Sequence, residues 1–465
     1  MIRNLTLALL FMCSFSITAQ TTYTLDSTEL TSRVVKDSLD IPWEIVWGPD
    51  NHIWMTERFG RVSRINPVTG VQSMLLDMSS DVYEQSESGM LGMVLHPDFD
   101  NNPEVFIVYT YLSGSDILER LVKFNYNGTS LIAVDTLIDN IKGNTTHIGS
   151  RIIILPDNTL LMTTGDGQDS QASQSTVALT GKILRMNLDG SIPNDNPIAG
   201  SYIYSFGHRN AQGLWYAPNG KLYSSEHGPR NDDELNVIAV NRNYGWPTVN
   251  GFCDTPPERA FCSANRVVEP LAAWTPTIAP SDIIWYDHPA IPELKNKLLM
   301  TVLKDKSLIA FDFNAGGDAL ISQTKYFKGD VDRLRDICVS PFGKIYLATN
   351  GASWSNSNPF SHSIIELSNA AYYANDTTTT SVHSNPPFFG IKIGPNPVLS
   401  GEALNLFITA GEKGEFALYD VVGRLVVTQP IEGSNSIDTK SFEGVYFWKI
   451  QLENGASKEG KLIVH

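Results

Sequence analysis

Polar residues capable of acid–base chemistry flank several short apolar runs of this chain. His147 precedes the run 152–155, and Asp166 follows the next run, 159–162. If the two runs form a β-hairpin, its outer ends return to one edge of a sheet, which places His147 beside Asp166. A histidine oriented by a carboxylate can act as a general base, because its tautomer is fixed and its imidazolium is stabilised. The sequence therefore predicts such a base here.

The same hairpin argument brings further charged and polar groups to this edge. Arg209 and Asn210 lead into the run 213–217, and the return run 222–225 leads out to Gly228 and Pro229. Flanking residues of three other predicted hairpins join them, namely Glu87, Lys304, Arg333, Arg335 and Asn350. Arginine offers a two-pronged fork to carboxylates, and lysine adds a point charge. Several cations around one base favour a planar ligand that carries several carboxylates.

The elements that must position these residues recur along the chain. Short β-prone runs follow six turns, which begin at Pro49, Pro97, Pro156, Pro218, Pro292 and Pro341. The spacing exceeds the roughly 40 to 50 residues of common propeller repeats, so the excess is expected in loops, which often carry function. Six four-stranded units closing in a ring predict an all-β fold with a six-bladed β-propeller. A β-sandwich is the structural alternative.

Composition and the amino terminus narrow the class of protein. The chain has 465 residues and a formal net charge of −16, which argues against nucleic acid or an anionic membrane as a partner. Residues 1–19 resemble a secretory signal peptide, because Arg3 precedes an apolar run that ends before Ala19. No later stretch reaches the about 18 consecutive apolar residues that a membrane helix needs. We therefore expect a secreted or cell-surface protein without a membrane span.

Three cysteines follow the leader. Cys253 and Cys262 bracket a short polar loop that an oxidising compartment could close with a disulfide, the alternative being two free thiols. Cys338 lies in an apolar run and is expected to be a small buried hydrophobic residue.

Composition changes near residue 370, which divides residues 25–370, the predicted propeller, from a linker at 371–389. Residues 390–465 carry a Pro-Asn-Pro start at 395–397, Tyr-Asp-x-x-Gly-Arg at 419–424 and Gly-Val-Tyr at 444–446. This segment resembles the type A sorting domain of the type IX secretion system, a small β-sandwich. The resemblance implies export across the outer membrane by that machinery. The alternative is a carbohydrate-binding or structural β-sandwich appendage.

The larger segment also resembles a known family, through motifs that follow one another in order. They include Pro42-Trp43-Glu44, Gly89-Met90-Leu91-Gly92, Gly207-His208-Arg209-Asn210, Asp232-Asp233-Glu234-Leu235-Asn236 and Asn243-Tyr244-Gly245-Trp246-Pro247. From about Asp40 to Leu367 the chain is similar to the soluble dehydrogenases of glucose and other aldoses that depend on pyrroloquinoline quinone (PQQ). These are six-bladed propellers. The resemblance implies an enzyme that oxidises the anomeric C1 hydroxyl of a sugar to the lactone, with an external electron acceptor.

The resemblance also implies a role for each residue. His147 would take the hydroxyl proton, Asp166 would orient His147, and Arg209 would stabilise charge on the quinone oxygen. The cofactor would contact Glu87, His147, Arg209, Asn210, Lys304, Arg333, Arg335 and Asn350. Carbonyl groups of Gly228 and Pro229 would hold a Ca²⁺ ion on PQQ, as suits a hard cation. A second Ca²⁺ would use the carbonyls of Asn250 and Phe252 with the Asp254 carboxylate.

Three positions depart from the family pattern and bear on which sugar is used. Glu87 and His227 replace glutamines, and Asn350 replaces a threonine. Two other functions remain open at this point, because propellers host many activities. A Ca²⁺-dependent sugar lactonase would need metal ligands at the same edge but not Lys304, Arg333 and Arg335. A non-catalytic binding propeller, similar to the hedgehog-interacting proteins, would not need His147.

Overall fold

The structure is a computed structural model that forms two compact units, Met1–Ser381 and Val382–His465. It describes residues 21–351 and 360–375 of the first unit. In the second unit it describes 392–394, 403–407, 413–420, 424–432, 434–440, 442, 444–452 and 457–464. The predicted signal peptide and most of the predicted linker lie outside the described residues.

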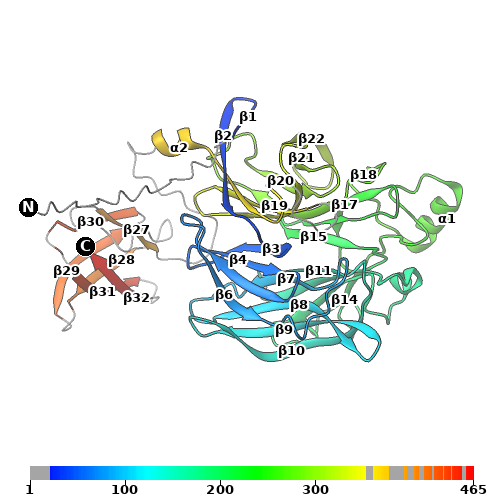
Figure 1. Ribbon diagram of the computed structural model, residues 1–465, viewed down its shortest axis with the longest axis horizontal. Coiled ribbons are helices and arrows are strands. Elements are labelled where there is room, and N and C mark those ends of the chain that lie inside the picture. Colours follow the sequence, from blue (N-terminus) through cyan, green and yellow to red (C-terminus); the bar gives the residue numbers. More distant parts are fainter. Residues whose placement is uncertain are drawn as a thin grey trace, which may run out of the picture. The chain divides into compact units, whose positions relative to one another are not determined.

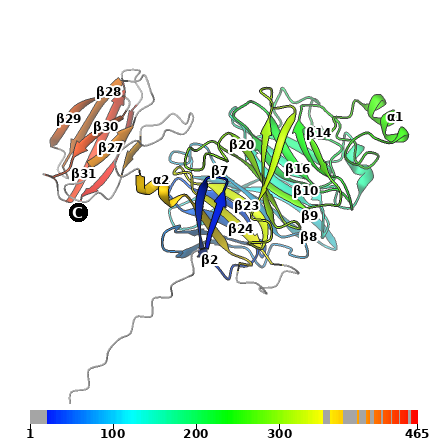
Figure 2. The same cartoon turned by 90° about the horizontal axis from the view of Figure 1, so that it is seen from above.

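The first unit is the predicted six-bladed propeller, which is confirmed (Figures 1 and 2). Five blades are four-stranded antiparallel sheets built from consecutive strands. They comprise β3 (Pro42–Trp47), β4 (Ile53–Glu57), β5 (Arg61–Ile65) and β6 (Gln72–Asp77); β7 (Met90–Leu95), β8 (Glu104–Ser113), β9 (Asp116–Tyr126) and β10 (Leu131–Lys142); β11 (Gly149–Ile154), β12 (Thr159–Thr164), β13 (Lys182–Asn187) and β14 (Ile203–Phe206); β15 (Ala211–Tyr216), β16 (Leu222–Glu226), β17 (Asp233–Ile238) and β18 (Ala272–Trp274); and β19 (Pro280–Tyr286), β20 (Lys297–Val302), β21 (Ser307–Phe313) and β22 (Leu320–Tyr326).

The sixth blade combines both ends of the propeller chain. Its order is β1 (Thr21–Leu25), β2 (Thr28–Lys36), β25 (Ile364–Ser368), β24 (Ile345–Asn350) and β23 (Arg333–Val339). The pairing of β2 with β25 joins residues from opposite ends of the unit, as in the pair Thr31 and Ser368. The innermost strands β3, β7, β11, β15, β19 and β23 each contact the next, and β23 contacts β3, which closes the ring.

Apolar side chains fill each interface between neighbouring blades. Blades one and two share Trp54, Met93 and Phe124, whereas blades six and one share Ile45, Cys338 and Tyr346. Cys338 is 4% exposed, so it is the buried hydrophobic residue that the sequence predicts. Stacked sheets with such faces exclude water between the blades, so that burial of these faces holds the ring together.

Strand register places the chemistry-bearing residues at one edge of the ring. In each hairpin the start of the inner strand pairs with the end of its neighbour, as in Gly149 with Thr164, Ala211 with Glu226 and Arg333 with Asn350. Residues just before the inner strands and just after their partners therefore converge. We call this edge the mouth. The extra residues of the long intervals lie in loops such as 165–181 and 239–271, as predicted.

The propeller unit continues beyond the predicted boundary at residue 370. Helix α2 (Ala370–Asn375) occupies the first residues of the predicted linker. Its Tyr372 packs against the apolar cluster between blades five and six, and Asn369 donates to the Ala290 carbonyl at 2.9 Å. Side-chain packing thus extends the ordered chain into a segment whose composition indicated a linker.

The second unit contains two antiparallel sheets around one apolar core. The smaller has the order β26 (Lys392–Gly394), β27 (Ala403–Phe407) and β30 (Ser434–Asp438). The larger has the order β29 (Leu425–Glu432), β28 (Lys413–Tyr419), β31 (Gly444–Leu452) and β32 (Ser457–Val464). Leu404 and Ile437 of one sheet belong to the same buried cluster as Phe416 and Ile450 of the other, which makes the unit a β-sandwich. None of the helices in the described residues has the length and apolar character to cross a membrane.

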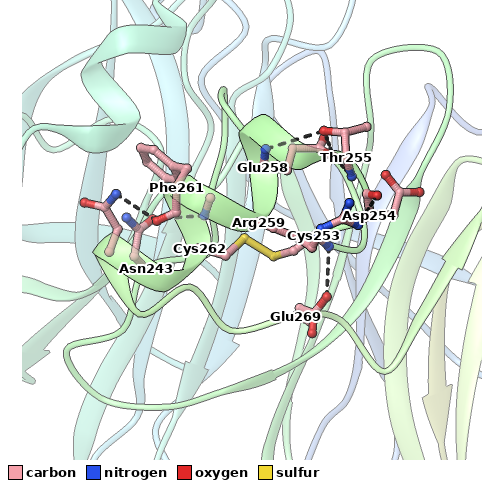
Figure 3. The surroundings of a disulfide bond; sticks show 12 residues. Asn243, Cys253, Asp254, Thr255, Glu258, Arg259, Phe261, Cys262 and Glu269 are labelled. Carbon is pink, nitrogen blue, oxygen red and sulfur yellow. Dashed lines mark hydrogen bonds between the residues drawn. A yellow bond between two sulfur atoms is a disulfide. The ribbon is translucent and has the colours of Figure 1, made fainter.

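A disulfide closes the loop that follows β17, as Figure 3 shows. Cys253 is joined to Cys262 of helix α1 (Pro256–Asn265), which projects from the propeller (Figures 1 and 2). Thr255 caps the helix through a reciprocal arrangement with Glu258, and the Cys253 amide donates to Glu269 at 2.8 Å. None of the helix residues is buried, so the bridge and the cap rather than packing hold this helix.

Replacing Cys253 with serine should lower thermal stability, since a disulfide across a short loop contributes on the order of 2 to 3 kcal/mol. Thermal unfolding of the two proteins would measure this. Cys262→Ser should give the same loss and the double variant no more, because all three changes remove one bond. Two titratable thiols in the native secreted protein would contradict the assignment.

Candidate active site

The mouth contains a histidine–carboxylate pair. His147 Nδ1 lies 2.8 Å from Asp166 Oδ1, so that Nδ1 carries a proton and donates a hydrogen bond to the ionised carboxylate. This leaves Nε2 as the ring nitrogen that carries no proton. Gly165 permits the approach, because a Cβ there would lie 1.8 Å from the His147 carbonyl oxygen. The structure therefore brings together the two residues that hairpin geometry places side by side.

Three donors surround the Asp166 carboxylate, which is 1% exposed. Besides His147, the Gln168 amide donates to Oδ1 and the Trp246 indole to Oδ2, each at 2.8 Å. Burial raises the pKa of Asp166, but the hydrogen bonds from His147, Gln168 and Trp246 outweigh it and leave this pKa below its usual value. Asp166 consequently stays ionised, as a carboxylate that orients a base must.

Arg209 reaches the same histidine from the next blade. Its Nη2 lies 2.9 Å from His147 Nε2, and its Nη1 donates to the His227 carbonyl at 3.0 Å. Its Nε is buried without a hydrogen-bond partner in the described residues. Burial lowers the pKa of Arg209, although the charges of Asp166, Glu226 and Glu87 oppose this effect. The guanidinium therefore has unused donor capacity beside His147.

Glu226 fixes the backbone that carries Arg209 and Asn210. Its Oε1 accepts the main-chain amides of both residues, the second at 3.2 Å. Its Oε2 lies 2.9 Å from His208 Nδ1, and His208 Nε2 lies 2.8 Å from Ser205 Oγ. The side chains of Glu226, His208 and Ser205 are all buried. Glu226 lies in the predicted strand end that leads to Gly228, but its sequence context assigns it no role.

Lys304, Arg333 and Arg335 form no ion pair with any carboxylate among the described residues. Arg335 is 5% exposed, and its partners are neutral: Asn350 Oδ1 and Gln212 Oε1, both at 3.0 Å. Burial, with the nearby charge of Arg333, lowers the pKa of Arg335 to about 9. Burial also lowers the pKa of Arg333, and Lys304 Nζ donates to Thr277 Oγ1 at 3.0 Å. Arg335 is thus a buried cation, and Arg333 a partly buried one, without an ion-paired carboxylate, whereas Lys304 is exposed. Such unpaired cations indicate a site for an anion.

The other predicted cofactor contacts have mixed surroundings. Glu87 Oε2 accepts the His147 amide at 2.8 Å and faces Asn210 Nδ2 at 3.4 Å, so Glu87 joins the group around the base. Asn350 is 1% exposed, and its Nδ2 donates to the Pro42 carbonyl at 2.9 Å while its Oδ1 accepts from Arg335. Both ends of this amide are engaged, which gives Asn350 the geometry of a support for Arg335.

Gly228 and Pro229, whose carbonyls are the predicted Ca²⁺ ligands, follow strand β16 in a turn of the backbone. Asp233 anchors this turn: its Oδ1 accepts the Gly228 amide at 2.8 Å, and its Oδ2 accepts the amides of Ile278 and Ala279. Gly228 and Pro229 line one small pocket, together with Arg209, Glu226, Glu234, Trp246 and Asn250. Carbonyl and carboxylate oxygens of this kind are the ligands that Ca²⁺ prefers.

The residues of the second predicted Ca²⁺ site are less closely grouped. The Phe252 carbonyl accepts the Asp254 amide at 2.8 Å, and the Asp254 carbonyl accepts from Arg259, as Figure 3 shows for Asp254 and Arg259. Asn250 lines the pocket described above, with its Oδ1 buried and unpartnered. Among the described residues, no group of three or more His, Cys, Asp or Glu side chains is arranged to bind a metal. The second site remains a prediction.

A buried charge cluster supports the inner strands next to the mouth. Arg151 of β11 contacts Glu44, Asp282 and Asp336 of three other inner strands at 2.5, 3.2 and 3.0 Å. Its guanidinium also lies 4.5 Å from the ring centre of Trp43. Removing one member of such a cluster leaves a buried charge unpaired, so the cluster fixes the blades relative to one another.

Comparison with known proteins assigns both units. Residues 39–355 match the family model of glucose/sorbosone dehydrogenases, and residues 392–465 match that of secretion system C-terminal sorting domains. The quinoprotein glucose dehydrogenase B of Acinetobacter calcoaceticus is 36% identical over 276 residues, which cover 52% of this chain and 58% of that protein. An aldose sugar dehydrogenase of Escherichia coli is 29% identical over 347 residues, 69% of this chain and 90% of that protein.

Among solved structures, the PQQ-bound aldose sugar dehydrogenase of Streptomyces coelicolor superimposes with a TM-score of 0.63 at 30% identity. The match covers 73% of this chain and 98% of that one.

Proposed function

The chain belongs to the glucose/sorbosone dehydrogenase family, and on that premise we propose that it oxidises the anomeric C1 hydroxyl of an aldose to the lactone with PQQ and Ca²⁺. One observation carries the proposal. Arg209 contacts His147, whereas strand register places Lys304, Arg333 and Arg335 at the same edge of the ring. None of the four cations has an acidic partner within ion-pair distance in the described residues.

These residues fit PQQ, which is planar and carries three carboxylates. The neutral partners of Arg335 and the unpartnered Nε of Arg209 leave positive charge and donors for such an anion. We assign the cofactor carboxylates and carbonyls to Arg209, Asn210, Lys304, Arg333 and Arg335. Asn350 would act through Arg335. The carbonyls of Gly228 and Pro229 would hold the Ca²⁺ ion.

When bound, PQQ would supply a quinone that accepts a hydride at C5, and Ca²⁺ would polarise the reactive carbonyl. The residues of the chain perform the proton chemistry. His147 Nε2 takes the proton from the C1 hydroxyl, while Asp166 holds Nδ1 protonated and stabilises the imidazolium that forms. Because Arg209 donates to Nε2 in this structure, the guanidinium must release that atom before it can accept the proton. Glu87, whose carboxylate lies beside the His147 backbone, would accept a hydrogen bond from a sugar hydroxyl.

The proposal is tested by titrating the purified apoprotein with PQQ, with and without Ca²⁺, followed by absorbance and calorimetry. We expect saturable binding that requires Ca²⁺, and a spectral change of the bound cofactor on adding members of an aldose panel. A protein that binds no PQQ in Ca²⁺ but hydrolyses sugar lactones would instead be the lactonase. One that does neither would be a binding propeller.

The second unit indicates where the enzyme acts. Its match to the secretion sorting domains indicates export by the type IX system to the cell surface or exterior. We propose that residues 1–19 direct the first step of this route as a signal peptide. The electrons would then pass to an acceptor outside the cell.

A further inference from the structure

Trp246 contacts the His147–Asp166 pair from a neighbouring blade. It lies in the loop 239–271 between β17 and β18, whereas His147 and Asp166 belong to the hairpin of β11 and β12. The indole Nε1 donates to Asp166 Oδ2 at 2.8 Å, and His147 Nδ1 donates to Oδ1 of the same carboxylate at 2.8 Å. The two oxygens are thus bound by an imidazole on one side and an indole on the other.

The same indole also faces Arg209. The guanidinium carbon lies 5.3 Å from the centre of the indole ring, within the range of a cation–π contact. Trp246 therefore touches both residues that bind the ring nitrogens of His147: the carboxylate at Nδ1 and the guanidinium at Nε2.

The backbone of Trp246 is itself held on both sides. Its amide donates to the Gly207 carbonyl at 3.0 Å, and its carbonyl accepts from Gln174 Nε2 at 2.6 Å. Gln174 also binds the side chain of Asn243, at the start of the same loop. Gln174 ends the short 3₁₀ helix η1 (Ser170–Gln174), within the loop that begins after Asp166. The two loops are consequently locked to each other next to the base.

We propose that Trp246 is a positioning residue for the base, which fixes the plane of the Asp166 carboxylate and the place of the Arg209 guanidinium. A carboxylate with a side-chain donor on only one oxygen can rotate about its Cβ–Cγ bond, and donors on both oxygens remove that freedom. The charged and titratable groups that face Asp166 are His147 and Arg209, and Trp246 is the neutral donor between them. Its effect on turnover rests on the proposed dehydrogenase function, but its effect on the apoprotein does not.

Trp246→Phe tests this, since it keeps an aromatic ring near Arg209 and removes only the N–H group. We expect kcat to fall about tenfold, the size of one hydrogen bond to a charged group, with PQQ affinity within about twofold. The hydrogen bond from Trp246 also helps to lower the pKa of Asp166, so the acid limb of the pH–rate profile should move to higher pH in the variant. Trp215→Phe is the matched control, because the Trp215 indole N–H is buried without a hydrogen-bond partner in the described residues and Trp215 lies toward the end of β15 away from the mouth.

A readout on the apoprotein separates this inference from the proposed function. The proton on His147 Nδ1 should give a low-field NMR resonance, identified by its loss in His147→Gln. In Trp246→Phe the Asp166 carboxylate becomes a stronger acceptor, so we expect this resonance to move further downfield, and not to move in Trp215→Phe. An unmoved resonance or an unchanged kcat overturns the inference. Failure of the wild-type protein to bind PQQ would overturn the proposed function while leaving the NMR result intact.

Discussion

His147→Ala should slow sugar oxidation by about 10²- to 10⁴-fold, the range for loss of a positioned general base. Only Nε2 of this ring can take up a proton, because Nδ1 already carries one and donates to Asp166. The affinity for PQQ should stay within a few-fold, since the proposed cradle consists of Ca²⁺, Arg209, Lys304, Arg333 and Arg335. Single-turnover reduction of the bound cofactor by saturating sugar would measure the chemical step, and calorimetry would measure the affinity.

His52→Ala is the matched control for this substitution. His52 lies in the turn between β3 and β4, at the opposite edge of blade one, and binds the Asp50 carbonyl. It should leave both quantities unchanged. Excess PQQ should not restore the rate of His147→Ala, and recovery by added cofactor would refute the assignment of His147 as the base.

Arg335→Ala should have the reverse effect and weaken PQQ binding roughly ten- to a hundredfold, the size of one or two charge-assisted hydrogen bonds. The rate at saturating PQQ should fall much less, because Arg335 does not contact His147. The apoprotein should lose little stability or gain some, since the substitution removes a buried cation that no carboxylate pairs with. Calorimetric titration and thermal unfolding with and without PQQ would measure the two effects.

Arg64→Ala is the control, because Arg64 pairs with Asp50 at the edge opposite the mouth. It should leave PQQ binding unchanged. Loss of stability in the Arg335→Ala apoprotein together with unaltered PQQ affinity would mean that Arg335 is structural. If Arg335→Ala and His147→Ala instead behaved alike, the division between cofactor binding and proton transfer would be wrong.

Hairpin geometry predicted much of the site from sequence. A hairpin returns its outer ends to one edge whatever the rest of the fold does, so the pairing of His147 with Asp166 needed no knowledge of blade packing. The repeated turns likewise predicted the number of blades, and the ordered motifs identified the family, which the family match confirms. The resemblance of the last 76 residues to a sorting domain is confirmed over residues 392–465.

Other parts of the site depend on contacts that no hairpin rule determines. Trp246 reaches Asp166 from an irregular loop of another blade, and the fold of that loop depends on Gln174 of a third segment. In the sequence Glu226 is only the last residue of a predicted strand. Its role in holding the backbone of Arg209 and Asn210 follows from the hydrogen bonds that its carboxylate accepts from their amides. Helix α2 occupies the start of the predicted linker, where Tyr372 packs against an apolar cluster of the propeller.

The closing blade sets the order in which this protein can be completed. Its strands β2 and β25 pair residues that are 337 positions apart, such as Thr31 and Ser368. As the chain emerges from a ribosome or a translocation channel, the first five blades can assemble from neighbouring strands. The edge of strand β2 that pairs with β25 stays unpaired until β25, the last strand of the propeller, has been made. Contacts so distant in sequence form slowly, and open edges invite pairing with other chains. The open edge of strand β2 therefore needs protection from pairing with other chains until β25 closes the ring.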